Sequence, residues 1–381
     1  MSRTVIDIHI LQTVPPSNLN RDDTGSPKTA VYGGQRRARV SSQAWKRATR
    51  TSFDALLDRA DLGERTKRLG ESLGELIAGQ APDLADAKID LANKALTALG
   101  LAKPAKATKA AKNKADDGVT AAESEYLVFL SHHQLDAIAA HAIAAHRAGK
   151  DPDGKELKKL ANQRHSVDIA LFGRMLADLS DTNVDAAVQV AHAISVHAVN
   201  NEFDYYTAVD DRKDDAKEQG AGMIGTVEFN SSTLYRYATL DVDRLNDNLG
   251  DPEATRRAVH AFVTAFAKSM PTGKQNTFAN RTLPDAVIVR LRDTQPINFV
   301  GAYEEVVTYD SPTGRVREAA ERLASYATSV ETTYGEQPVA AWISRVGDHT
   351  AALDTLGDAL PFADLVTAVA DEAAARLGKE E

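Results

Sequence analysis

The sequence predicts an α+β protein in which an open sheet carries helices on one side. Runs of alternating hydrophobic and polar residues, typical of strands, recur at residues 4–13, 226–242 and 285–293. Segments of helical periodicity separate these strands, which lie far apart in the sequence. The length of 381 residues exceeds one minimal domain. We therefore expect two units, or one domain with a large insertion.

The first strand, residues 4–13, is predicted to be half-buried, with three isoleucines on one face. The other face is partly polar and stays available for function. The first face carries Ile6, Ile8 and Ile10, and the second carries Val5, Asp7, His9 and Leu11. Pro15 and Pro16 end the strand, and a long loop then runs to Ser41. A loop of that length inside a compact domain is usually functional or mobile.

A helix is predicted from Ser41 to about Arg59, because the paired serines supply acceptors for the free amides of the first turn. Residues 60–165 form a largely helical region, and residues 121–148 within it are predicted as one helix. A lysine/alanine insert at residues 101–118 interrupts this region. Such a composition cannot bury a core, so we expect the insert to be a disordered loop; the alternative is a nucleic-acid-binding tail.

The middle of the chain is predicted to pass from short elements into a protruding arm. Residues 166–179 begin as a strand-like run and continue as a short helix, and residues 184–199 are predicted as an amphipathic helix. Residues 197–226 are highly charged, end in glycines and lack clear periodicity. We interpret them as an arm that leads into the strand at 226–242.

The last third of the chain is predicted to form a helix, then a strand, then further helices. Asp251, followed by proline, predicts the start of a helix. Its predicted buried stripe consists of Val259, Phe262, Val263, Phe266 and Met270. A basic loop, PTGKQNTFANRTLP, leads to the strand at 285–293, and helices follow at about 315–333 and 362–377. This order suits ferredoxin-like or RNA-recognition folds, whose free sheet face can hold a ligand.

The composition narrows the class of protein. Hydrophobic residues make up 43% of the chain, which is enough for a globular core, but the apolar runs are too short to span a membrane. There are no cysteines, which excludes disulfides and thiolate metal sites. The first residues lack the features of a signal peptide, so we expect a cytoplasmic protein.

Charge in the N-terminal segment predicts an anion site. Residues 1–50 hold nine Lys/Arg and three Asp/Glu, a net charge of +6, which leaves −15 for the rest of a chain whose total is −9. On the predicted helix Gln43, Lys46 and Arg50 share one face, whereas Trp45 can pack inward. Three further arginines favour phosphate binding over a merely solvated face. They are Arg36, Arg37 and Arg39.

Histidines and carboxylates elsewhere suggest an alternative function, a metal-dependent ribonuclease. The candidates are His132, His133 and Asp136, His165 with Asp168, and the acidic run Asp210, Asp211, Asp214 and Asp215. No HExxH, GxGxxG, Walker A or GxSxG pattern accompanies them. We therefore interpret the histidines as structural or surface residues, and we expect no enzyme, no metal and no cofactor.

Three smaller features allow more than one interpretation. Tyr205 and Tyr206 either anchor the arm to a core or form a stacking platform for bases. Gly33 and Gly34 form either a phosphate-binding nest or a simple turn. Met175 is by default a buried methionine.

Several blocks of the sequence resemble the CasC (Cse4) family, which provides the crRNA-binding backbone subunit of type I-E CRISPR Cascade complexes. The blocks are LNRDD, GG-Q-RR-A-R-VSSQAWKRA-R, VDIALFGRM, AHAISVHAV, DYYTAVDD, GTVEFNSSTLYRYA and PTGKQNTFA. They occur in the family's order between residue 1 and about residue 290. The resemblance fades over the lysine/alanine insert and the C-terminal helices.

The resemblance implies a hand-shaped subunit with an RNA-recognition-motif-like (ferredoxin-like) palm. The inserted helical finger region would span 60–165 and the protruding thumb arm 197–226. The palm would comprise 1–59, 166–196 and 227–381, the last with the C-terminal helices. Copies would stack head to tail along the crRNA, beside other Cascade subunits, and would present the guide's bases to target DNA.

The resemblance also implies roles for single residues, and it implies that the chain is not catalytic. By this resemblance, the residues that contact the RNA backbone are Arg21, Lys28, Gln43, Lys46 and Arg50. Met175 would wedge against bases, and Tyr206 on the thumb would contact a kinked nucleotide.

Overall fold

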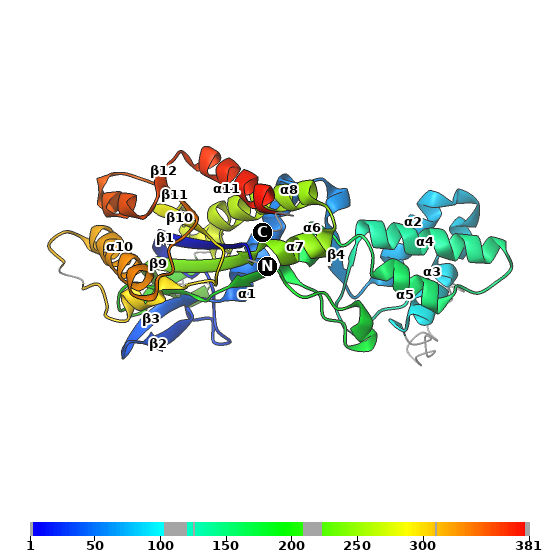
Figure 1. Cartoon of the computed structure of the whole chain (residues 1–381). Helices are drawn as coiled ribbons and strands as arrows, with labels where there is room; N and C mark the ends of the chain where they lie inside the picture. The colour runs from blue at the N-terminus through cyan, green and yellow to red at the C-terminus, as the bar shows by residue number, and fades with distance from the viewer. Residues whose placement is uncertain (1–2, 103–119, 125, 209–222, 309–310, 378–381) are drawn as a thin grey trace, which may run out of the picture. The chain divides into compact units, whose positions relative to one another are not determined.

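The computed structural model describes residues 3–102, 120–124, 126–208, 223–308 and 311–377 (Figure 1). Most of the predicted disordered insert, and the acidic run that begins at Asp210, lie outside these residues. The chain forms two compact units. Unit 1 comprises Met1–Phe53, Val188–Asp243 and Arg256–Glu381, and unit 2 comprises Asp54–Ala187 and Arg244–Thr255.

Unit 1 is built on one large mixed sheet. In the described residues its strand order is β12-β11-β10-β1-β9-β7-β3-β2, and β6 and β8 also pair with β9. The pairing is antiparallel except between β11 and β12. The strands are β1 Val5–Ser17, β2 Thr29–Tyr32, β3 Gln35–Val40, β6 Val188–Val190, β7 Ala193–Ser195, β8 Glu202–Ala208, β9 Met223–Asp241, β10 Ala286–Arg292, β11 Ala340–Arg345 and β12 Asp358–Ala359.

The helices of unit 1 agree with most of the predicted ones. They are α1 Ser42–Ser52, most of α8 Pro252–Lys268, α9 Gln275–Phe278, α10 Arg315–Tyr334 and α11 Phe362–Arg376, with 3₁₀ segments η6 Phe299–Tyr303 and η7 Asp348–Leu356. The stripe predicted for α8 is buried throughout, from Val259 to Met270. The helix predicted from Ser41 ends at Ser52, short of Arg59, and β11 was not predicted.

Both faces of the sheet are covered, so the predicted free face is wrong. One face of β1 lies on the side of α1 and α8, where Ile6, Ile8 and Ile10 are fully buried. On the other face, Leu11 belongs to a hydrophobic cluster with residues of η6, η7 and α10, among them Tyr303 and Leu323. Residues 297–303 and α10 return over this face, which the alternation within β1 alone could not reveal.

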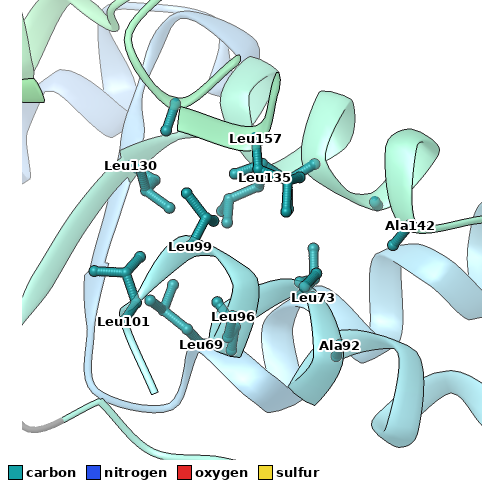
Figure 2. Close-up of a cluster of buried hydrophobic side chains, with 14 of the residues drawn as sticks. Leu69, Leu73, Ala92, Leu96, Leu99, Leu101, Leu130, Leu135, Ala142 and Leu157 are labelled. Carbon is teal, nitrogen blue, oxygen red and sulfur yellow. The ribbon is translucent and has the colours of Figure 1, made fainter. Parts of the chain in front are cut away.

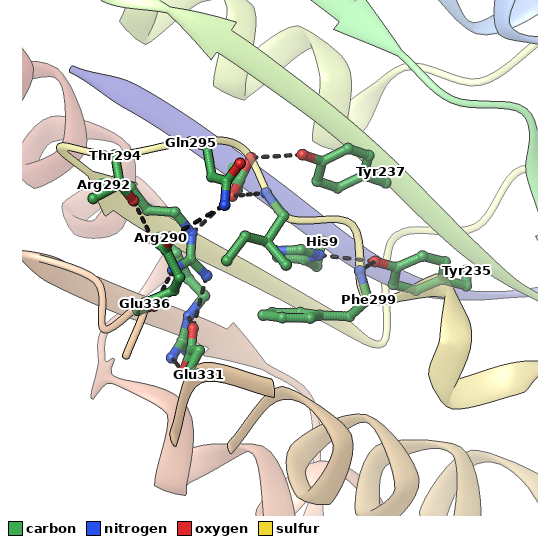
Figure 3. Close-up of polar contacts among 12 residues, drawn as sticks. His9, Tyr235, Tyr237, Arg290, Arg292, Thr294, Gln295, Phe299, Glu331 and Glu336 are labelled. Atoms are coloured by element: carbon green, nitrogen blue, oxygen red, sulfur yellow. Dashed lines mark hydrogen bonds and ion pairs between the residues drawn. The ribbon is translucent and has the colours of Figure 1, made fainter. Parts of the chain in front are cut away.

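Beneath η6 the second face of the sheet holds a buried polar network (Figure 3). Asp7 accepts hydrogen bonds from Tyr237 (2.7 Å) and from Arg292 (2.9 Å), and Arg292 also donates to Glu331 (2.7 Å). His9 shares a 2.8 Å hydrogen bond with the hydroxyl of Tyr235. Nε2 of His9 is buried and has no hydrogen-bond partner among the described residues. The other groups of the network satisfy one another, so the polar side chains of β1 belong to the core and do not face a ligand.

The segment from Pro15 to Val40 is more regular than predicted. β1 continues through Pro15 to Ser17 with a register shift after Val14, and a β2–β3 hairpin replaces the predicted loop. Gly33 and Gly34 form the hairpin turn, with φ values of 57° and 73°. A two-residue turn with positive φ at both positions favours glycine and matches the twist of the strands.

The amphipathic helix predicted for residues 184–199 is wrong. Residues 188–190 and 193–195 form β6 and β7, and both pair with β9. The predicted stripe contained mostly alanines, which favour a helix locally and so concealed the strands. Pairing with the long strand β9 therefore decided the structure.

Unit 2 has its own core, made largely of leucine and alanine side chains from four helices and a short strand (Figure 2). Its elements are β4 Gly63–Thr66, α2 Leu69–Gln80, α3 Lys88–Leu99, β5 Val128–Ser131, α4 His132–Arg147, α5 Gly154–Ala161, α6 Val167–Phe172 and most of α7 Val242–Leu249. Leu101 and Ala102, at the start of the predicted disordered insert, are buried in this core.

Two predictions for this unit need correction. The helix predicted for residues 121–148 is a strand, β5, followed by α4, and the strand-like start of residues 166–179 is the helix α6. Residues 166–187 belong to unit 2, whereas the sequence placed 166–196 with the palm. α6 packs against β4 and β5, and this packing extends the unit to Ala187.

Candidate nucleic-acid interface

The helix α1 begins at a well-defined N-cap. The Ser41 hydroxyl accepts a hydrogen bond from the amide of Ala44 (3.3 Å), as the paired serines predicted. The Ser41 amide donates to Oδ1 of Asn20 (2.9 Å), which ties the helix to the preceding loop. On the inner side of α1, Trp45 and Thr49 are buried.

A buried arginine of β9 holds α1 against the sheet. The guanidinium of Arg236 lies 3.6 Å from the centre of a ring of Trp45 and 4.6 Å from that of Phe266 on α8. It also donates to Oε1 of Gln12 (2.6 Å). Burial lowers the pKa of Arg236 to about 9. This cation–π arrangement fixes which face of α1 is turned outward.

The outward face of α1 carries the predicted donors. Gln43 is exposed, and Lys46 and Arg50 are partly exposed. Burial lowers the pKa of Lys46. Among the described residues, no acidic side chain lies within ion-pair distance of its ammonium group. A partly desolvated cation without a carboxylate partner is suited to binding an external anion.

The loop that carries Arg21 and Lys28 is ordered by its own contacts. Asp22 accepts hydrogen bonds from the hydroxyl (2.7 Å) and amide (2.9 Å) of Thr24, which lower the pKa of Asp22. The hydroxyl of Ser26 donates to Glu228 of β9 (2.8 Å). Arg21 stays exposed at the surface of this loop.

His192 joins this cluster, although the sequence did not single it out. Its Nδ1 accepts a hydrogen bond from the amide of Ser42 at the start of α1 (3.2 Å). Burial, followed by the charges of Arg39 and Lys28, lowers its pKa. The neutral ring therefore carries its proton on Nε2 and is a donor beside two cations. A single histidine between two short strands left no signal in the sequence.

Arg37 does not belong to the exposed basic cluster, contrary to the prediction. It is fully buried and donates to the carbonyl oxygens of Ser195 (2.9 Å) and Tyr303 (2.8 Å). It therefore attaches the β2–β3 hairpin to β7 and η6. Arg36, the residue before it, is exposed, and Arg39 is partly exposed.

Tyr206 lies on the arm strand β8, opposite Gly225 of β9. A Cβ atom at Gly225 would come within 2.4 Å of Cζ of Tyr206, so the ring lies directly over the glycine. The side chain is 43% exposed, and Tyr205 is 62% exposed. Among the described residues neither tyrosine is buried in a core, and the stacking-platform interpretation stays a prediction.

Met175 is exposed, so its default interpretation as a buried methionine is wrong. Its side chain is 86% exposed, and it belongs to unit 2. The preceding Arg174 is buried and donates to the carbonyls of Thr182 (3.0 Å) and Ala161 (3.0 Å). The amide of Leu176 donates to Asn183 (2.7 Å). These anchors on both sides hold an apolar side chain out in solvent.

The candidate metal ligands that the structure describes do not converge. Asp168 accepts hydrogen bonds from the hydroxyl of Ser166 (2.6 Å) and the amide of Gly63 (3.1 Å). His165 hydrogen bonds with Gln134 (3.1 Å). Within the described ranges no three His, Asp or Glu side chains could hold a metal ion together. Nor does any helix in those ranges have the length and apolar character needed to cross a membrane.

Comparison with known proteins points to one family. The model of a family described as CT1975-like protein matches residues 6–368. A solved chain from a "CRISPR RNA-guided surveillance complex, pre-nicking" is 35% identical, with a TM-score of 0.82, and the match covers 97% of this chain and 100% of that one. A second, from a "CRISPR RNA-guided surveillance complex", is 31% identical, with a TM-score of 0.74 and coverage of 97% and 99%. No curated protein matches the sequence.

Proposed function

Because the chain belongs to the CT1975-like protein family, we propose that it is a non-catalytic crRNA-binding backbone subunit of a type I-E CRISPR surveillance complex. The observation that carries this proposal is the similarity to chains of such complexes over nearly the full length of both partners. The cationic face of α1, with no carboxylate partner at Lys46 among the described residues, supports RNA binding by this chain.

In this proposal the α1 face and the loop before it hold the sugar–phosphate backbone of the guide. Arg21, Lys28, Gln43, Lys46 and Arg50 contact phosphates and riboses, and they leave the base edges free to pair with target DNA. Such contacts do not depend on the guide's sequence. An acidic chain with a local basic face would also disfavour indiscriminate coating of RNA.

The rest of the chain would complete a hand-shaped subunit. The sheet of unit 1 would be the RNA-recognition-like palm, residues 60–165 the fingers and residues 197–226 the thumb. Tyr206 would contact a kinked nucleotide, and Met175 would wedge against bases. Copies would assemble head to tail in the cytoplasm with other Cascade subunits, because a heterologous contact between identical chains builds an open array.

A charge-matched pair of variants tests the RNA-binding face. Lys46→Ala removes one charge from the proposed face of α1, and Lys155→Ala removes one charge from an exposed lysine of α5 that is not among the proposed contacts. We expect Lys46→Ala to weaken binding of a single-stranded RNA and to reduce the salt slope by about 0.7 for each phosphate that the chain no longer neutralises. The double variant Lys46→Ala, Arg50→Ala should weaken it further. Equal effects of Lys46→Ala and Lys155→Ala would contradict the proposed site.

The guide itself can be identified by sequencing the RNA that co-purifies with the chain. We expect CRISPR repeat–spacer units to be enriched over total cellular RNA. A random sample of cellular RNA would contradict the proposed role.

A further inference from the structure

The basic loop between α8 and β10 covers a cavity that the proposed contacts do not use. The cavity has a volume of about 310 Å³ and lies in unit 1. Its lining residues are Met270, Pro271, Gln275, Asn276, Ala279, Asn280 and Arg281. Residues 271–284 contain two basic and no acidic side chains. The lining therefore combines apolar side chains with three carboxamides and one arginine.

Three carboxamides at this cavity have no partner in the described part of the chain. Asn280 is only 3% exposed, and its Nδ2 forms no hydrogen bond. A buried donor without a partner costs free energy unless a ligand or water satisfies it. Gln275 and Asn276 are exposed, and their side chains also form no hydrogen bond within the described residues. The unpaired donors and acceptors thus gather at one cavity.

The backbone of the loop is strained, and its ends are fixed. Lys274 and Ala279 have positive φ values of 50° and 47° on either side of α9. For residues with a Cβ atom this conformation is unfavourable. At its end, the loop is held by Gln12, whose Nε2 donates to the carbonyl of Thr282 (2.9 Å). The loop therefore holds these two strained residues in one fixed conformation.

The loop lies against the segment that we propose to hold the guide. A Cβ atom at Gly273 would come within 2.2 Å of the carbonyl oxygen of Leu19, so the two backbones are in direct contact. Leu19 leads into Arg21 and Lys28. On its other side, the ring of Phe278 packs against Phe229 of β9, with the ring centres 5.7 Å apart. An RNA strand held by the residues after Leu19 therefore passes next to this loop.

The chemistry of the cavity fits a sugar better than a phosphate or a base. Neutral carboxamides both donate and accept, which matches a hydroxyl group, whereas phosphates are held mainly by cations. Base edges must remain free for pairing in the proposed role. Arg281 lines the cavity, and Lys274 directly precedes the lining residue Gln275, so the loop also supplies two cations for the phosphates that flank such a sugar. A volume near 310 Å³ is at the small end of ligand sites and suits a single nucleotide unit.

We propose that this cavity binds the ribose of one guide nucleotide and, through its 2′-hydroxyl, selects RNA over DNA. The inference rests on the proposed RNA-binding function. The carboxamides of Asn280, Gln275 and Asn276 bind the 2′-hydroxyl. This group is the one that distinguishes the two nucleic acids at a given position.

The test compares the affinities of the full chain for a labelled single-stranded RNA and for the DNA of the same sequence. Two variants remove carboxamides, Asn280→Ala in the interior and Gln275→Ala with Asn276→Ala at the rim. Removing one hydrogen bond of 0.5–1.5 kcal/mol corresponds to about a 2- to 12-fold loss of RNA affinity. We expect this loss for RNA with no change for DNA, so that the RNA/DNA ratio falls.

Lys274→Ala with Arg281→Ala is the matched control, because it removes charge and leaves the carboxamides in place. It should lower RNA and DNA affinity together and keep their ratio. If the unaltered chain binds RNA but the carboxamide variants leave the ratio unchanged, this inference is overturned while the proposed function stands. If the unaltered chain does not bind RNA, both are overturned. The rim variant keeps the test valid even if Asn280→Ala fails to fold.

Discussion

Replacing Arg37 with methionine tests whether this arginine supports the fold or binds RNA. Methionine fills similar space but donates no hydrogen bond. Arg37 donates to the carbonyl oxygens of Ser195, Tyr303 and Glu304, and the bonds to Ser195 and Tyr303 are fully buried. An unsatisfied buried acceptor costs about 1–3 kcal/mol, so the two together amount to about 2–6 kcal/mol of lost stability.

Chemical denaturation followed by tryptophan fluorescence measures this loss. The two tryptophans of the chain, Trp45 and Trp342, both lie in unit 1, so the signal reports the unit that contains Arg37. Arg36→Met is the matched control, because Arg36 is the exposed neighbour on the same strand. We expect Arg36→Met to change the free energy of unfolding by less than about 0.5 kcal/mol.

This reasoning would be refuted if Arg37→Met left the unfolding transition unchanged and weakened RNA binding more than Arg36→Met does. Arg37 would then be an RNA ligand, as the clustering of arginines in the sequence predicted.

Three further predictions concern other parts of the chain. The Nε2 of His197 accepts hydrogen bonds from the Thr233 amide (3.1 Å) and from Arg315 (3.1 Å), and burial lowers its pKa to about 4. In the unfolded chain His197 has its ordinary pKa of about 6.5, so the unfolded chain binds a proton more readily than the folded chain. As the pH falls from 7 to 5, the free energy of unfolding of unit 1 should therefore decrease by about 2 kcal/mol through this residue. His197→Gln should flatten that dependence, measured by fluorescence at each pH; an unchanged slope would contradict it. Gly225→Val should displace the Tyr206 ring and weaken RNA binding roughly tenfold, as loss of one stacked base would, while the melting temperature stays constant. A large fall in that temperature would mean that Gly225 serves the fold instead. Leu96→Ala should destabilise unit 2 by about 2–5 kcal/mol in circular dichroism without moving the fluorescence transition of unit 1; a coupled shift of both transitions would contradict independent units.

Local signals in the sequence predicted the elements whose stability is mostly local. The alternation in β9 and β10, the serine cap of α1 and the buried stripe of α8 all belong to this group, and each is confirmed. The predicted family is also confirmed, because several long motifs occur in order. Strands that depend on partners distant in the sequence were harder to predict. β6 and β7 have three residues each and exist because β9 lies beside them.

For the candidate site, the sequence located the segment but could not separate ligands from anchors. Arg36 and Arg37 are adjacent and carry the same charge, yet one is exposed and the other buried. The difference arises because η6, more than 250 residues later, places carbonyl oxygens above Arg37. His192 was missed for the same reason, since only the folded chain brings it to the start of α1. The roles of Lys46 and Arg50 in binding RNA remain predictions.

The way α1 is held explains why a buried arginine lies under it. Burial opposes the charge of Arg236, but a methionine there would leave two buried acceptors, Oε1 of Gln12 and the carbonyl oxygen of Phe266, without this donor, at a cost of about 2–6 kcal/mol of stability. The guanidinium also contacts the ring of Trp45 on α1, that of Phe266 on α8 and the Gln12 amide on β1, and so fixes three elements at one angle. An apolar side chain would fill the space without setting that angle. Because RNA contacts lose less entropy when donors are already in place, the position of α1 matters for binding as well as for stability. Arg236→Met should therefore lower both the RNA affinity and the free energy of unfolding, and a loss of stability with unchanged RNA affinity would show that Arg236 serves stability alone.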